Sequence, residues 1–150
     1  MIRVQREDFD VGAEIARLAE GRHEVGGIVS FLGVVRDTAG ASRIGAMTLE
    51  HYPGMTEKKL GEIEAEARRR WQLEASLIVH RYGRLEPGER IVLVVTAAAH
   101  RQAAFEACEF LVDWLKTKAP FWKLEETATG PRWVEAQAGD DEAAERWVAE

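Results

Sequence analysis

Residues 90–126 read RIVLVVTAAAHRQAAFEACEFLVDWLKTKAPFWKLEE, and this stretch contains a strand pattern, a helix pattern and a second strand pattern in succession. Residues 90–99 form an apolar run rich in valine, which is typical of a buried strand. From His100 onward apolar residues recur at the spacing of one helix face, at Ala104, Phe105, Cys108, Leu111, Val112 and Leu115. Pro120 disfavours helical geometry in the residue before it, so we expect the helix to end near Ala119 and residues 121–128 to be extended.

The segments on either side continue this mixture of strands and helices. Residues 75–83, ASLIVHRYG, are separated from residues 90–99 by a turn-forming Glu-Pro-Gly-Glu sequence, and the two runs are predicted to pair as a hairpin. The other predicted elements are a strand at 2–5, a helix capped by Asp10, a buried strand within 25–36, a strand at 44–52, an amphipathic helix at 55–71 and an extended segment at 131–136. Two long helices among strands, without strict strand–helix alternation, favour an α+β fold with a mostly antiparallel sheet.

Length and composition predict one globular domain that spans residues 1–150. The chain is 46% hydrophobic and 31% charged, and no apolar stretch approaches the roughly 20 residues that cross a bilayer. Its net charge of −6 argues against nucleic-acid binding, which normally needs a basic excess. The acidic tail, residues 139–150, is interpreted as a solubilising surface.

Cysteine usage and the N-terminus predict a cytoplasmic protein. Cys108 is the only cysteine, which excludes an intrachain disulfide and a multi-cysteine zinc site and fits a reducing compartment. The first ten residues are charged and lack the apolar core of a secretory signal. We therefore expect no membrane partner, no metal and no cofactor.

Three lysines lie beside bulky apolar residues where the long helix gives way to the next strand. On the helix, Lys116 borders the buried face, whereas Lys118 is rotated from it by about 200° and is expected to face water. In the strand, period-two alternation places Phe121, Lys123 and Glu125 on one face. Lys123 is therefore predicted to face back toward Lys116.

The other end of the same helix carries a second candidate site. His100 and Arg101 follow an apolar strand at a helix N-terminus, where unpaired N–H groups and the positive end of the helix dipole favour an anion such as phosphate. At the helical rise of 1.5 Å per residue, His100 and Lys116 are separated by about 24 Å. One small ligand contacts both only if the helix starts late, if it bends, or if a second chain completes the site, and the sequence leaves these three alternatives open.

Each candidate also has a purely structural interpretation. A lysine in the last helical turn commonly compensates the helix dipole at the surface, and a His-Arg pair commonly caps a helix. Arg36 is most simply a strand-end residue whose stem covers apolar surface. The basic residues His51, His80 and Arg81 are most simply strand residues near a sheet edge. Cys108 lies in the apolar stripe and is interpreted as an inert packing group.

Five segments carry recognisable motifs: FLGVVR (31–36), LEHYPGMTEKKLGEI (49–63), VHRYGRLEPGE (79–89), AHRQAAFEACEFLVDWLKTKAPFWKLE (99–125) and GPRWVEA (130–136). Together they resemble the catalytic (large) subunit of molybdopterin synthase, the MoaE family. The patterns HR-x-x-AF and LK-x-x-AP-x-WK are distinctive, and the resemblance covers nearly the whole chain in order.

This resemblance implies an α/β-hammerhead fold and a sulfurtransferase. Members convert cyclic pyranopterin monophosphate (precursor Z) into molybdopterin by installing the two sulfurs of its dithiolene, a step of molybdenum cofactor biosynthesis. The sulfur arrives on a small ubiquitin-like carrier subunit, whose C-terminal Gly-Gly carries a thiocarboxylate and threads into the large subunit. The implied assembly is a heterotetramer, with a central homodimer of large subunits and one carrier at each end.

The resemblance implies two essential lysines, which fall by position on Lys116 and Lys123. The implied substrate contacts are these lysines together with Val34, Val35, Arg36, His100, Arg101, Leu124 and Glu125. We expect Lys116 to meet the carrier tail and Lys123 to assist proton transfer at the pterin, while the arginines and the histidine hold phosphate and pterin. The alternative is a non-catalytic dimeric module that binds a phosphorylated metabolite or a partner tail through the same cations.

Overall fold

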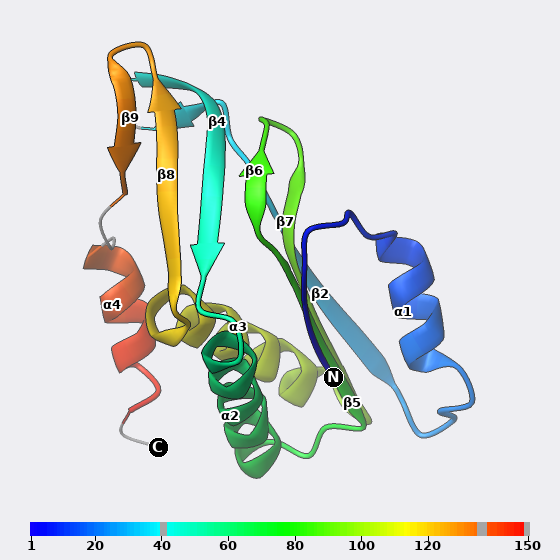
Figure 1. Cartoon of the computed structure of the whole chain (residues 1–150). Coiled ribbons are helices and arrows are strands. Elements are labelled where there is room, and N and C mark those ends of the chain that lie inside the picture. Colours follow the sequence, from blue (N-terminus) through cyan, green and yellow to red (C-terminus); the bar gives the residue numbers. More distant parts are fainter. Residues whose placement is uncertain (40–41, 135–137, 149–150) are drawn as a thin grey trace.

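The computed structural model describes residues 1–39, 42–134 and 138–148, and it confirms an α+β fold, here with two sheets (Figure 1). In chain order the elements are β1 (Ile2–Gln5), α1 (Val11–Ala19), β2 (Gly27–Val34), β3 (Thr38–Ala39), β4 (Ser42–His51), α2 (Met55–Arg70), β5 (Ala75–Arg81), β6 (Gly83–Leu85), β7 (Arg90–Ala98), α3 (Arg101–Lys118), β8 (Phe121–Thr127), β9 (Gly130–Trp133) and α4 (Ala138–Glu145). None of the helices in these ranges is both long and apolar enough to cross a bilayer.

The first sheet has four strands in the order β1-β5-β7-β2. β1 runs parallel to β5, and the β5–β7 and β7–β2 pairs are antiparallel. The predicted pairing of residues 75–83 with 90–99 is therefore confirmed. The short strand β6 was not predicted, and it pairs with β4 in the second sheet, so only Tyr82 separates a strand of one sheet from a strand of the other.

The second sheet has five strands and stands above the helices in Figure 1. Its long antiparallel pair is β4 with β8, in a register that places Lys123 opposite Leu49 and Phe121 opposite His51. β9 continues the sheet beyond β8, and β6 pairs on the other side of β4. The candidate lysine strand therefore lies inside this sheet and not at its edge.

Two apolar cores lie on opposite faces of the four-stranded sheet. α2 and α3 cover one face, and α1 covers the other (Figure 1). α1 begins where predicted, because the Asp10 carboxylate accepts a hydrogen bond from the Ala13 backbone N–H at 3.0 Å. The core under α2 and α3 includes Leu60, Ile63, Ile78, Val94, Phe110 and Leu111, and the core under α1 includes Phe9, Leu18, Leu77, Val79, Leu93 and Val95.

The prediction that residues 25–36 form a buried strand is wrong in one respect. β2 is an edge strand, and its side chains alternate between half-buried and exposed. Ile28, Leu32 and Val34 are exposed because α1 packs against β5 and β7 and leaves this end of the sheet uncovered. A Cβ on Gly33 would lie 2.7 Å from Val92 Cγ1, so β2 packs closely against β7 at this glycine.

Two further expectations fail. Phe105 was placed in the buried stripe of α3, but its side chain is 59% exposed, on a flank of the helix that no described element covers. The tail is more than a solubilising surface. Its α4 helix is followed by Trp147, which contacts Trp71 and Phe110 and donates a hydrogen bond from its indole N–H to Asp113 at 2.8 Å.

Phe110 is the centre of this aromatic cluster and allows a test of the fold. Its ring is fully buried, and Trp71, Trp114 and Trp147 lie within 4.5–5.7 Å of it between ring centroids. We expect Phe110→Ala to lower the free energy of unfolding by about 3–5 kcal/mol, measured by urea denaturation, because it leaves a cavity among rings that cannot all collapse. Val148→Ala, at a 64% exposed position beside the same cluster, is the control and should be near neutral. A small loss at Phe110 would contradict its burial among these three rings.

Candidate active site

The lysines at the end of α3 have different surroundings. Leu115 is buried, and Lys116 beside it carries its ammonium at the surface. Lys118 lies over the ring of Trp114, with its Nζ 4.9 Å from the ring centroid. The charge of Lys116 acts on the buried histidine described below, so the two helical lysines have different neighbours.

A tight turn joins α3 to β8. The backbone N–H of Phe121 donates to the carbonyl of Ala119 at 2.9 Å, across Pro120. β8 therefore starts at once, and its side chains alternate as predicted: Trp122 is exposed, whereas Phe121 and Lys123 are half-buried and Glu125 is buried.

His80 forms the base of this region. It lies on β5, is only 4% exposed, and stacks on Phe121 with 3.7 Å between ring centroids and 17° between ring planes. Burial is the main cause that lowers the pKa of His80 to about 3. The charges of Lys123 and Lys116 also lower it, so the field of each ammonium group reaches this imidazole ring. Lys123 shares its face of β8 with Phe121, which stacks on His80, and Lys116 lies on the last turn of α3, so the two lysines flank the corner between α3 and β8.

The remaining candidates on β8 have separate positions. The carboxylate of Glu125 is buried and accepts a hydrogen bond from Arg132 of β9 at 3.1 Å. This ion pair ties β9 to β8, so Glu125 supports the strand that carries Lys123. Leu124 projects from the opposite face of β8, on the side of Trp122.

Val34, Val35 and Arg36 leave the end of β2 in different directions. Val34 and Arg36 are exposed, while Val35 is buried in the core under α2 and α3. The backbone N–H of Val35 donates to Glu89, and its carbonyl accepts from Gly88, both at 2.9 Å. Val34 and Arg36 are therefore the members of this trio whose side chains are accessible to a ligand.

His100 and Arg101 lie at the far end of α3 from Lys116. Both are exposed and line a surface pocket of about 480 Å³ together with Gln102, Phe105 and Glu106. α3 begins at Arg101 and continues as one helix to Lys118, so a late helix start does not bring the two ends together. The structure leaves these cations about 24 Å along the helix from Lys116 in the same chain.

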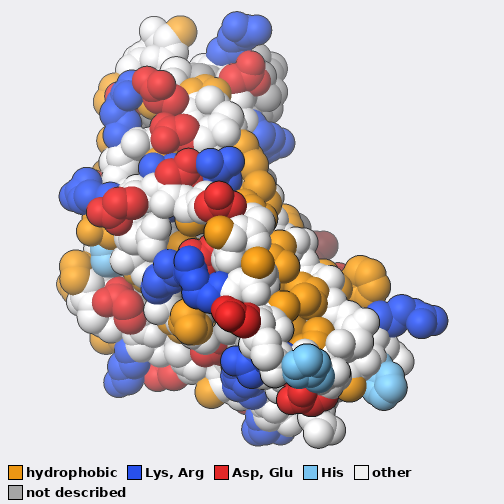
Figure 2. All heavy atoms as spheres, turned by 90° about the vertical axis from the view of Figure 1, so that its right-hand side faces the viewer, with side chains coloured by type: hydrophobic (Ala, Val, Ile, Leu, Met, Phe, Trp, Pro, Cys, Tyr) orange, Lys and Arg blue, Asp and Glu red, His pale blue; other side chains and the backbone are white. Residues whose placement is uncertain are grey.

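An apolar edge runs beside this pocket. We use this name for the exposed side chains of Ile28, Leu32 and Val34 on β2 and Phe105 on α3. Figure 2, which views the molecule from the side of α1 and β2, shows hydrophobic side chains gathered in a band across this face. α3 contacts β2, so the pocket with His100 and Arg101 belongs to the same side of the molecule.

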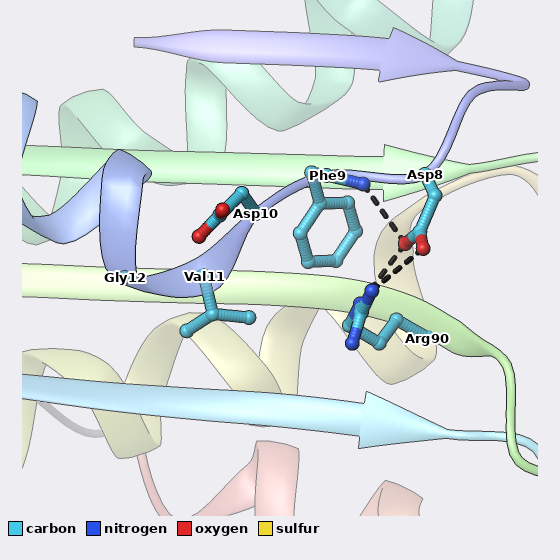
Figure 3. Close-up of a pocket in the computed structure, with 6 residues that line it drawn as sticks. All are labelled: Asp8, Phe9, Asp10, Val11, Gly12 and Arg90. Carbon is cyan, nitrogen blue, oxygen red and sulfur yellow. Dashed lines mark hydrogen bonds and ion pairs between the residues drawn. The ribbon is translucent and has the colours of Figure 1, made fainter.

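A second pocket, of about 560 Å³, lies at the start of α1 (Figure 3). Its charged groups are already engaged with each other or with the backbone. Arg90 donates two hydrogen bonds to Asp8, at 3.0 and 2.7 Å, and Asp10 caps α1. These contacts hold the N-terminal segment against β7, so we interpret this pocket as part of the fold and not as a ligand site.

Cys108 has the properties of a packing group. Its thiol is buried in α3, and burial raises its pKa to about 11. At neutral pH it is a thiol, not the nucleophilic thiolate. Among residues 1–39, 42–134 and 138–148, no group of three or more His, Cys, Asp or Glu side chains is placed to hold a metal ion.

Sequence reasoning missed His80. The prediction that His80 and Arg81 lie near a sheet edge is wrong, because β5 lies between β1 and β7. Both residues are buried. The available signal was the position of His80 inside the otherwise apolar run ASLIVHR, where a polar ring must find a specific partner.

Known proteins of one kind match this chain. The profile of the MoaE protein family matches residues 4–118. Molybdopterin synthase catalytic subunits from Mesorhizobium japonicum and Escherichia coli are 56% and 53% identical to it, each over 97% of this chain, and the aligned region covers 92% and 97% of their own lengths.

Solved structures agree with the sequence matches. The molybdopterin biosynthesis MoaE protein of Burkholderia ambifaria superposes with a TM-score of 0.85 at 52% identity, covering 100% of this chain and 99% of its own. A molybdopterin-converting factor structure from Helicobacter pylori, 17% identical over 91% of each chain, superposes with a TM-score of 0.75 and shares the fold. Motifs, fold and near full-length identity above 50% therefore agree, and the chain belongs to the MoaE family of molybdopterin synthase catalytic subunits.

Proposed function

We propose that this chain transfers sulfur from the thiocarboxylated tail of a small ubiquitin-like carrier to cyclic pyranopterin monophosphate, with Lys116 and Lys123 as its catalytic residues. The observation that carries the proposal is the position of Lys116 and Lys123 on either side of the corner between α3 and β8, where Phe121 stacks on the buried ring of His80. Two cations over an apolar, partly dry base attract a thiocarboxylate and a phosphate more strongly than cations in open water do.

The two lysines have separate roles in this proposal. Lys116 is exposed at the end of α3, where the tail of an incoming protein reaches it, so it meets the carrier and assists sulfur transfer. Lys123 is half-buried and lies deeper against the base, where partial desolvation favours proton transfer at the pterin. The Helicobacter pylori structure is a complex of subunits 1 and 2 of molybdopterin-converting factor, which supports a separate subunit as the sulfur source. The inert Cys108 is consistent with imported sulfur.

A second copy of the chain completes the site. α3 is one continuous helix from Arg101 to Lys118, which supports the alternative in which His100 and Arg101 reach Lys116 from another molecule. The apolar edge, which includes Phe105 beside these cations, is the surface that we assign to the homodimer. Arg36, with His100 and Arg101 of the second copy, holds the phosphate and pterin, and one carrier binds at each end of the heterotetramer. We place the reaction in the cytoplasm, because a lone buried cysteine fits a reducing compartment.

Reconstitution from purified parts tests this function. We expect the chain, a thiocarboxylated carrier and cyclic pyranopterin monophosphate to yield molybdopterin, detected as its fluorescent oxidation product. The same carrier ending in an ordinary carboxylate should yield none. If the loaded carrier binds but no product forms with active carrier and intact pterin, the chain is the non-catalytic binding module and the proposal fails.

A further inference from the structure

One buried ionisable group at the site has no part in the proposed chemistry. His80 occupies the central strand β5, where its neighbours across the sheet are Val4 on β1 and Val92 on β7. A histidine surrounded by apolar side chains is costly to bury unless its ring nitrogens are satisfied. Its contacts therefore need an explanation.

The contacts of His80 fix both its tautomer and its plane. Its Nδ1 lies 2.8 Å from the backbone carbonyl of Arg81, which only accepts hydrogen bonds, so Nδ1 carries the proton. Its ring stacks nearly parallel on Phe121. Since His80 belongs to the four-stranded sheet and Phe121 to the five-stranded sheet, this stack joins the two sheets.

The stack acts on the corner that separates the two lysines. Phe121 is the first residue of β8 and is held by the tight turn back to Ala119. Lys116 lies on the last turn of α3 before that corner, and Lys123 lies two residues after it on the face of Phe121. Fixing the ring of Phe121 therefore fixes the backbone positions from which the two lysine side chains extend.

Burial is the main cause that keeps His80 neutral, and nearby basic groups add to it. Lys123 faces it from β8, Lys116 from α3 and His51 from β4, and each disfavours a positive charge on its ring. The guanidinium of the adjacent Arg81 is directed elsewhere, to the carbonyls of Arg6 and Arg90. A third cation between the lysines would weaken their hold on their own protons and repel them from each other.

We propose that His80 is a positioning residue of the sulfur-transfer site: a neutral imidazole, protonated on Nδ1 and stacked on Phe121, that holds Lys123 at a fixed place relative to Lys116. This inference rests on the proposed roles of the two lysines. A positioning role requires both the ring of His80 and its Nδ1–H. An ordinary core residue that only packs requires the ring alone.

Two substitutions separate these requirements. His80→Phe keeps the stack and removes the Nδ1–H, and His80→Asn keeps a donor near the Nδ1 position and removes the ring. We expect each to lower kcat by about 10–100-fold through misplacement of the lysines, while KM for the loaded carrier stays within about twofold. The same two substitutions at His23, which is exposed between α1 and β2, are the controls and should leave kcat unchanged.

A measurement on the unaltered chain covers the case in which the His80 variants do not fold. With ¹⁵N-labelled histidine, NMR should show His80 as the neutral Nδ1–H tautomer at every pH between about 5 and 9. An Nε2–H tautomer, or titration in this range, overturns the inference, and so does a wild-type kcat in His80→Phe. If the lysine variants lose activity and His80→Phe keeps the wild-type rate, only the role of His80 is overturned. If the lysine variants keep wild-type rates, the proposed function itself is overturned.

Discussion

Lys123→Ala is expected to lower kcat for molybdopterin formation by about 10²–10⁴-fold, and Lys116→Ala to have an effect of the same order, because each removes a group that assists bond making or proton transfer in the transition state. The measurement is the rate at saturating loaded carrier and pterin. Saturation matters, since removal of a residue that only binds substrate raises KM and leaves kcat unchanged.

Lys118 supplies a matched control for both variants. It belongs to the same Lys-rich segment and carries the same charge, but its ammonium lies over the ring of Trp114. Lys118→Ala should therefore keep kcat near the wild-type value. If all three variants lose the same activity, the effect comes from net charge or stability, and if none does, the lysines are not catalytic.

The second large effect is recovery of activity from two inactive chains. One chain carries Lys123→Ala, and the other carries the double change His100→Ala and Arg101→Ala; each homodimer should be nearly inactive. In a mixed two-fold dimer one site receives both lesions and the other receives none. Random pairing should therefore restore about a quarter of the wild-type sites. The measurement is the rate of a co-expressed mixture, with mixed dimers verified by two different affinity tags.

The control for this experiment mixes Lys123→Ala with Lys116→Ala. The proposed site takes both lysines from one chain, so every site of every dimer then lacks a lysine and no activity should return. Recovery in the control would mean that the two lysines serve different sites. Failure of the first mixture, with mixed dimers present, would contradict the assignment of His100 and Arg101 to the neighbouring copy.

The strongly patterned parts of the fold are predictable from the sequence. β5, β7 and α3 carry long apolar patterns, and Pro120 marks the end of α3, so their types and approximate limits follow from local rules. β6 was missed because three residues carry no periodicity. α4 was missed because its short, polar sequence gives no sign that Trp147 packs on Phe110, a contact between distant parts of the chain.

Exposure proved harder to predict than secondary structure. Periodicity assigned Phe105 to the apolar side of α3, and composition assigned β2 to the interior. The packing of α1 and the other elements decides which flank of a helix or end of a sheet remains exposed. The local spacing of apolar residues does not contain that information. Both errors fall on the apolar edge, where a partner copy is proposed to supply the missing cover.

Candidate residues for the site could be named from the sequence, but their arrangement could not. Alternation in β8 was enough to predict that Lys123 faces the side of Phe121, and family resemblance supplied the roles of the lysines. The convergence on His80 was not predictable, because it depends on the stacking of a strand from one sheet on a strand from the other.

The edge strand β2 also affects the tendency of the newly made chain to aggregate. A newly made chain presents this strand, with its outer backbone groups unpaired and Ile28, Leu32 and Val34 in water, to every other unfinished protein around it. Such a strand is a template for uncontrolled strand addition, and self-association competes with that outcome only at sufficient chain concentration. If the proposed dimer forms through the apolar edge, solubility and assembly are coupled in this protein: the side chains that dimerisation would cover are the ones that make an isolated copy prone to aggregate.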